Sequence, residues 1–239
     1  MILAFIDETS DANDAKYFGL CCAVVNSNFY GQIKNDFQKK LISSGWDPKI
    51  EFKGSCLFSA SRGDTSMQVD KRVELAGDIL SLNTSKVNAR MKFAYLKKAE
   101  SANQKLDYLT YLPALLKRIL AKVSKKCGKN ILSVQCDYRT DIRSEEVREA
   151  IAPVISERGY VLFEDVVLSK SGFNTVGLLY ADIVGYLSSR VDTITNDSQL
   201  FENIAPEHWT TDGRLRKLRS STTLLKRIKE FKRYQVVPK

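Results

Sequence analysis

The sequence predicts an α/β protein in which helices cover both faces of a mixed sheet, and two observations predict it. Short apolar segments typical of strands alternate along the chain with segments whose apolar residues recur every three or four positions, as on one face of a helix. The first two strand-like segments follow one another directly, so the sheet is expected to open with a hairpin. No G-x-G-x-x-G or G-x-x-x-x-G-K-[ST] occurs, which leaves a glycine-rich phosphate loop without support.

The N-terminal part of the chain predicts strands and helices in turn. Phe29, Ile33 and Phe37 recur at four-residue intervals and therefore line one face of the first expected helix. The segment that carries Glu51 and Lys53 is expected to be extended. In order, the expected elements are strands at 1–6 and 17–25 joined by a polar loop at 10–16, a helix at 28–42, a strand at 49–58, a helix at 67–82 and a strand at 85–96.

The remainder of the chain continues the alternation. Ser144 is expected to cap a helix, because acidic residues follow it in what would be the first turn. The expected elements are a helix at 102–126 with a basic second half, a strand at 130–136, a helix at 144–158, a strand at 160–168 and a helix at 174–190. At 239 residues and 44% apolar composition, we expect one large domain at 1–195, followed by a polar linker and basic segment at 196–239.

Histidine and cysteine usage excludes several kinds of site. The chain has a single histidine, His208, which excludes a histidine-rich metal site and two-histidine ribonuclease chemistry. Its five cysteines are odd in number and lack C-x-x-C spacing, so reduced thiols are expected rather than a zinc site or a redox pair. Any catalysis must therefore depend on carboxylates, lysines, tyrosines or a bound metal.

Targeting signals are missing from the sequence. No apolar run reaches the roughly 18 residues of a membrane span, and Asp7 and Glu8 stand where a signal peptide would need its hydrophobic stretch. We therefore expect a cytoplasmic protein without a membrane partner.

The net charge of +9 is concentrated near the C-terminus. From Arg214 to Lys239 there are ten Lys or Arg residues and one acid, whereas the preceding residues balance. A neutral body with a basic tail suggests contact with nucleic-acid phosphates, although a solvated basic helix or an acidic protein partner would show the same charge. The residues that we expect to bind nucleic acid are Arg214, Arg216, Lys217, Arg219, Lys226 and Arg227.

Three carboxylates stand where a charge is costly. Asp7 and Asp137 each follow an apolar strand-like run, and Asp182 lies within GLLYADIVGYL. A buried carboxylate costs several kcal/mol unless it is paired or binds a cation. Each acid could form a salt bridge, with Lys53, Arg139 and Arg190 respectively. A shared divalent metal site would explain all three together.

Four short motifs resemble, in order, those of a known protein family. They are IDETS at 6–10, EFKGS at 51–55, CDYR at 136–139, and a late serine followed by GLLYAD at 177–182. They are similar to the D-E-S-G, E-x-K, D-x-R and G-L-Q-x-A-D motifs of the bacterial and phage domain-of-unknown-function family 3800. The resemblance spans 6–190 and implies an RNase H-like fold. The chain departs from it at Thr9-Ser10, where Ser-Gly is usual, and at Leu179, which replaces Gln beside the expected site.

The resemblance also implies a set of site residues. It makes Asp7, Glu51, Asp137 and Asp182 a metal-binding quartet, with Glu8 as a fifth acid beside it. Asp7 would bridge two Mg²⁺ or Mn²⁺ ions, and the other three acids would complete their shells.

Basic side chains with two different roles are expected beside the metal site. Lys53 would share a face with Glu51 if the segment is a strand, and it could hold the scissile phosphate. Arg139 and Arg190 would orient the carboxylates.

Function then follows from the metal site, with two alternatives. We expect a metal-dependent nuclease that hydrolyses DNA, RNA or hybrid duplex, in phage defence or a mobile element, with a homodimer left open. The first alternative is a non-catalytic nucleic-acid-binding protein of the same fold, which Leu179 favours. The second is a protein-interaction component of a phage-conflict system, acting through the basic tail.

Overall fold

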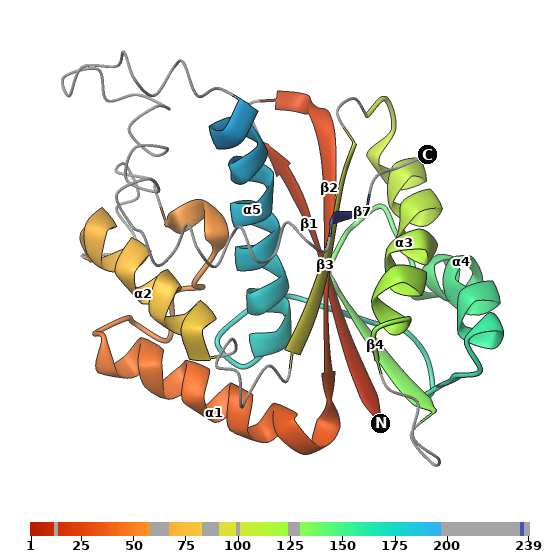
Figure 1. Ribbon diagram of the computed structural model, residues 1–239, viewed down its shortest axis with the longest axis horizontal. Coiled ribbons are helices and arrows are strands. Elements are labelled where there is room, and N and C mark those ends of the chain that lie inside the picture. The colour runs from red at the N-terminus through yellow and green to blue at the C-terminus, as the bar shows by residue number, and fades with distance from the viewer. Residues whose placement is uncertain are drawn as a thin grey trace.

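A mixed β-sheet runs through the middle of the protein and separates two layers of helices (Figure 1). The computed structural model describes residues 1–11, 14–57, 67–82, 91–98, 101–123, 130–196 and 235–236. The predicted α/β class, with a hairpin first and helices on both faces, is confirmed.

The sheet combines an antiparallel and a parallel half. The spatial order is β5-β4-β1-β2-β3-β7. Strand β6 also pairs with β4, farther along β4 than β5 does. The pairs β1/β2 and β2/β3 are antiparallel, whereas β1/β4, β4/β5, β4/β6 and β3/β7 are parallel. The strands are β1 (Ile2–Asp11), β2 (Asp14–Asn26), β3 (Met91–Lys98), β4 (Ile131–Asp137), β5 (Val161–Leu162), β6 (Val167–Ser169) and β7 (Gln235–Val236).

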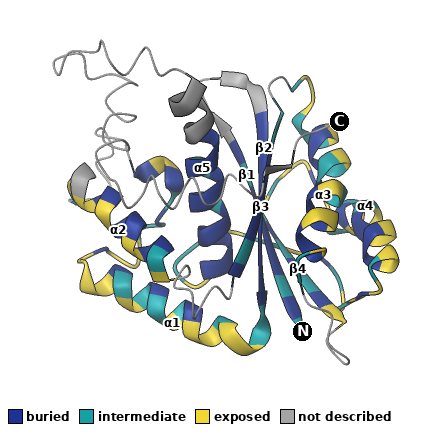
Figure 2. Ribbon diagram, in the orientation of Figure 1, coloured by how far each residue is buried: buried dark blue, intermediate teal, exposed yellow. Residues whose placement is uncertain are grey.

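Each face of the sheet has its own apolar core. One core lies between the sheet and α1 (Ser27–Ser43), α2 (Val69–Leu82) and α5 (Val176–Asn196). The other lies beneath α3 (Gln104–Leu120) and α4 (Ser144–Glu157). Figure 2 shows the buried residues gathered where the helices face the strands.

Because both faces are covered, β1 is apolar at successive positions rather than at alternate ones. Phe5 belongs to the α5-side core, whereas Ala4 and Ile6 belong to the α3-side core. Successive side chains of a strand point to opposite faces. Asp7 is therefore directed to the α5 side and Glu8 to the α3 side.

Several expected elements differ from those observed. The hairpin strands extend to Asp11 and from Asp14, so most of the polar loop expected at 10–16 is strand. The strand expected at 160–168 is interrupted between β5 and β6, where Glu164 has φ 56°. The helix expected at 144–158 begins at Ser144 itself, and Arg143 occupies the cap position.

The strand expected at 49–58 is wrong. The described part of this segment contains a short 3-10 helix, η1 (Gly54–Cys56), and no strand. Its apolar residues, including Phe52 and Leu57, are buried in the α5-side core, where Phe52 packs edge-on against Trp46 at 4.8 Å between ring centres. The segment is apolar because it packs against helices, and it has no neighbouring strand to pair with.

Two further observations concern the expected cellular setting. No helix among the described ranges is long and apolar enough to cross a membrane. The four cysteines within those ranges are buried free thiols, and reduced thiols were expected.

The domain boundary expected at 195–196 coincides with the end of α5. Most of the basic segment that follows lies outside the described residues.

Candidate metal centre

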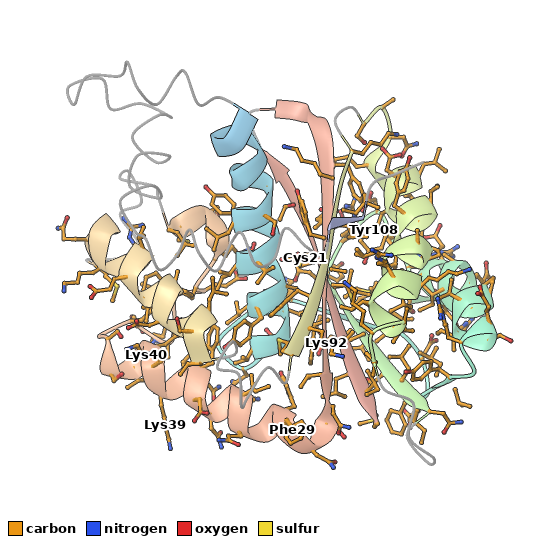
Figure 3. All side chains as sticks on the ribbon, viewed as in Figure 1. Cys21, Phe29, Lys39, Lys40, Lys92 and Tyr108 are labelled. Carbon is orange, nitrogen blue, oxygen red and sulfur yellow. The ribbon has the colours of Figure 1, made fainter. Side chains whose placement is uncertain are left out.

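Four of the predicted acids lie where the middle of β1 and the end of β4 meet α5 and η1. Asp7 is on β1, Asp137 ends β4, Asp182 is on α5, and Glu51 precedes η1. The last parallel pair joining the two strands is Ile6 with Cys136, so Asp7 and Asp137 are the next residues in register. Cys21, the β2 partner of Asp7, is labelled beside α5 in Figure 3.

Asp7 is the most buried of the four acids, with 5% of its surface exposed. Burial raises the pKa of its carboxyl well above the usual value, and the charges of Asp182, Asp137 and Glu51 raise it further. The positive charge of Lys53 acts in the opposite direction. These effects show that all four acids and the lysine lie close enough to interact electrostatically.

The Asp182 carboxylate is fixed by a hydrogen bond from η1. Its Oδ2 accepts the backbone N–H of Gly54 at 2.5 Å. Burial raises the pKa of Asp182 to about 6, although the Gly54 hydrogen bond and Lys53 both lower it.

Gly54 allows η1 to approach α5 this closely. A Cβ at this position would lie 2.4 Å from the Cβ of Tyr186 on α5. The absence of a side chain therefore lets the segment that carries Glu51 and Lys53 lie against the helix that carries Asp182. Sequence reasoning missed this role, and the glycine directly after the E-x-K motif was the available signal.

Glu51 and Lys53 form a pair beside the buried acids. Lys53 Nζ lies 3.1 Å from Glu51 Oε2. Burial tends to lower the pKa of Lys53, but the hydrogen bond and charge of Glu51, with the charges of Asp182 and Asp137, raise it overall. The other oxygen of Glu51, Oε1, is buried and has no hydrogen-bond partner among the described residues.

Asp137 is oriented by a residue that sequence reasoning missed. The backbone N–H and the hydroxyl of Ser171 both donate to Asp137 Oδ1, at 3.0 and 2.7 Å. Ser171 lies in the loop between β6 and α5, so the hydrogen bonds fix the strand-end acid relative to the start of the helix. The salt bridge considered between Asp137 and Arg139 does not form, because Arg139 pairs with Glu8 and Asp141.

Glu8, predicted as a fifth metal-binding acid, is not brought together with the other four. It lies on the α3 side of the sheet and forms an ion pair with Arg139. The guanidinium of Arg139 lies 5.5 Å from the ring centre of Tyr108 on α3. Figure 3 labels Tyr108 on the opposite side of the sheet from Cys21.

The donor set suits a hard divalent cation. The described residues hold no group of three or more His, Cys, Asp or Glu side chains already arranged to ligate one ion. Mutual repulsion between carboxylates disfavours such a cluster when no cation is present. Carboxylate oxygens are the ligands that Mg²⁺ and Mn²⁺ prefer, and the unpartnered Glu51 Oε1 and the buried Asp7 are available for them. The residues present therefore fit a divalent metal.

Two solved structures are distantly similar to this chain. Ribonuclease HII from Archaeoglobus fulgidus, solved in a complex with PCNA, aligns over 95% of this chain and 91% of its own, with TM-score 0.39 and 14% identity. Ribonuclease H2 from Pyrococcus horikoshii OT3 aligns over 97% and 99%, with TM-score 0.41 and 11% identity. The strand order and directions described above decide the class. The fold is RNase H-like. No protein-family model and no curated protein matches the chain.

Leu179 occupies a core position of this RNase H-like fold. It is fully buried in the apolar core on the α5 side. Its side chain therefore contributes to the packing of α5 against the sheet and its neighbouring helices.

The remaining predicted residues cannot be placed. The side chain of Arg190 lies outside the described residues. So do all six residues expected to bind nucleic acid: Arg214, Arg216, Lys217, Arg219, Lys226 and Arg227.

Proposed function

We propose that this protein is a divalent-metal-dependent nuclease that hydrolyses phosphodiester bonds in nucleic acid. The observation that carries the proposal is the Asp7 carboxylate, buried within β1 one residue past the last β1/β4 backbone pair, with three further acids close enough to raise its pKa. Such an arrangement costs several kcal/mol in an apo protein. A bound cation would reverse that cost, because each carboxylate would then face a positive charge.

In this proposal Asp7, Glu51, Asp137 and Asp182 hold two Mg²⁺ or Mn²⁺ ions. When bound, the ions would supply positive charge to the attacking and leaving oxygens of a phosphodiester. The ion-holding residues come from two strands, a helix and a loop, so the tertiary fold is needed to assemble them.

Other groups of the chain orient the acids and the substrate. Ser171 fixes Asp137 through two hydrogen bonds, and the N–H of Gly54 fixes Asp182. Lys53 keeps its proton at neutral pH because its pKa is raised, and its side chain is 41% exposed. Its ammonium group is therefore available to a substrate phosphate, where charge develops during hydrolysis.

The substrate class is nucleic acid, and DNA, RNA and hybrid duplex are all compatible with the site. The basic residues from Arg214 to Arg227 would contact phosphates and make binding depend steeply on salt. The family resemblance supports a setting in phage defence or a mobile element, and the absence of an apolar run long enough for a membrane span supports a cytoplasmic one.

The test is cleavage of labelled single-stranded DNA, RNA, duplex DNA and RNA:DNA hybrid with Mg²⁺, Mn²⁺ or EDTA. Wild type is compared with Asp7→Ala and Asp137→Ala, and with Glu149→Gln as an exposed acid on α4, which covers the opposite face of the sheet from the four acids. We expect metal-dependent cutting that both site variants abolish and the control retains. Equal inactivity of wild type and site variants on every substrate would overturn the proposal.

A non-catalytic nucleic-acid-binding protein is the second candidate. The observation that favours it is that the described acids are not already arranged around one ion. It predicts that wild type binds nucleic acid equally well in EDTA and in Mn²⁺, without cutting it. Leu179 also supports this candidate, because its side chain is fully buried and offers no polar group where the motif that the chain resembles has Gln.

A further inference from the structure

We infer that Arg139 is a positioning residue, which links β1 to the end of β4 on the face opposite the four acids and thereby sets the approach of Asp7 to Asp137. Because this role assumes that the two aspartates hold metal ions, it rests on the proposed function. It adds a residue that touches neither metal nor substrate.

Arg139 is fixed in three directions. Its Nη1 forms an ion pair with Glu8, and its Nε and Nη2 donate to the two oxygens of Asp141 at 2.9 and 2.8 Å. Its guanidinium packs over Tyr108. Only 12% of the Arg139 side chain is exposed, so the planar group is held against α3 with little freedom to rotate.

The ion pair lies where the backbone pairing stops. The parallel ladder between β1 and β4 ends at Ile6 and Cys136, one residue before Asp7 and Asp137. Glu8 follows Asp7 on β1, and Arg139 is the second residue after Asp137. The Glu8 to Arg139 contact is therefore a link between β1 and the end of β4, just beyond the two acids.

The ion pair between Glu8 and Arg139 opposes the electrostatic repulsion between the site carboxylates. Asp7 and Asp137 are adjacent in register just past the last β1/β4 backbone pair, and two ionised carboxylates placed side by side repel one another. Repulsion between the two strands at this point would widen the gap that a metal ion must bridge. An ion pair of low exposure is weakly screened by salt, so it can hold the gap before a metal ion binds.

An ordinary surface ion pair would not have this effect. Arg148 and Asp165 lie 2.9 Å apart, but their side chains are 44% and 43% exposed. Such pairs contribute little to stability. Arg148→Gln therefore serves as a matched control for Arg139→Gln.

The experiment measures Mn²⁺ affinity by electron paramagnetic resonance of free Mn²⁺, at a temperature where circular dichroism shows every variant folded. The proteins are full-length wild type, Arg139→Gln, Glu8→Gln, the double variant and Arg148→Gln. We expect each single change at the link to weaken Mn²⁺ binding about tenfold, as loss of groups that orient metal ligands does elsewhere. The double variant should be no weaker than either single variant, and the control should match wild type.

Three outcomes would overturn the inference. Unchanged Mn²⁺ affinity in Arg139→Gln, with only a lower melting temperature, would make Arg139 merely structural. Losses that multiply in the double variant would mean that Glu8 and Arg139 act separately, for instance with Glu8 as a metal ligand. Wild-type protein that binds no Mn²⁺ would overturn the proposed function and this inference with it, whereas the first two outcomes leave the proposed function standing.

Discussion

At the scale of single residues, Asp7 shows how a functional group can oppose folding. It is buried, and within the described ranges its Oδ1 accepts a single, local hydrogen bond, from the N–H of Glu8 at 2.8 Å. Three other acids lie close enough to disfavour its charge. Groups held at a cost to stability are typical of sites that bind or react.

Asp7→Asn should therefore make the metal-free protein more stable while abolishing cleavage. The amide oxygen can still accept the Glu8 N–H, and the buried charge disappears. We expect the free energy of unfolding in EDTA at pH 7 to rise by about 1–3 kcal/mol. Urea denaturation checks this, with Glu149→Gln as a control that should change stability by less than about 0.5 kcal/mol. A less stable Asp7→Asn would contradict this account of Asp7.

Asp182 gives a related prediction about pH. Its folded-state pKa of about 6 lies above the value in an unfolded chain. Between these two pKa values the folded state therefore binds more protons than the unfolded state, and the folded state gains stability as the pH falls. The ionised side chain therefore destabilises the apo protein at pH 7, and this cost is removed as the pH falls through 6.

Asp182→Asn should accordingly be more stable than wild type at pH 7, and the difference should shrink by pH 5. The measurement is urea denaturation of both proteins in EDTA across this range. A difference that stays constant or grows on acidification would show that Asp182 does not titrate there.

At the scale of elements, the expected helices are all observed, because their apolar periodicity survives in the sequence. The helix expected at 28–42 is observed at Ser27–Ser43, for example, but the one expected at 102–126 ends at Leu120 and the one expected at 174–190 continues to Asn196. The segment at 49–58 was misassigned, because a short apolar run is the same whether it pairs in a sheet or packs against helices. Asp7 and Asp137 could be found from the apolar runs before them, although β1 continues to Asp11 and Asp7 therefore lies within the strand.

The supports of those acids could not be found in this way. Ser171 reaches Asp137 across 34 residues, and Gly54 reaches Asp182 across 128. Local pattern carries no information on contacts between such distant segments. The placement of Glu8 on the opposite face from Asp7 did follow from strand alternation, but only once β1 was known to continue past Ile6.

The contact between η1 and α5 gives a prediction at the same scale. Gly54→Ala would place a Cβ 2.4 Å from that of Tyr186, so η1 must move away from the helix. We expect Mn²⁺ affinity to fall about tenfold and the free energy of unfolding to fall by about 1–3 kcal/mol.

Gly77→Ala on α2 is the matched control, because a Cβ added there would meet nothing within 4 Å. It should raise stability by about 0.5–1 kcal/mol, as alanine does within helices. Isothermal titration with Mn²⁺ and urea denaturation measure both effects. A Gly54→Ala protein with wild-type affinity would show that η1 does not position the site.

At the scale of the whole molecule, the four acids join elements from both sides of the chain's midpoint. Strand β1 and the η1 segment come from the N-terminal part, and β4 and α5 from the C-terminal part. A ligand held by all four would bind the folded chain and not the unfolded one.

Mn²⁺ should therefore raise the melting temperature of wild type. At 100 times the dissociation constant, the added stability is about 2.7 kcal/mol. Thermal unfolding with and without Mn²⁺ measures the shift, which should be absent from Asp137→Ala and present in Glu149→Gln. An equal shift in wild type and Asp137→Ala would place the bound ions elsewhere.

The coverage of β1 on both faces has a consequence for folding errors. Ala4, Phe5 and Ile6 are all buried, so burial of apolar surface distinguishes poorly between the native alignment and one slipped by a single residue. Such a slip would exchange the two neighbouring acids, directing Glu8 toward α5 and Asp7 toward Arg139. The slipped chain would be compact and well covered, yet its carboxylates would be misplaced for binding metal. Selection of the native alignment then depends on polar contacts such as that between Glu8 and Arg139.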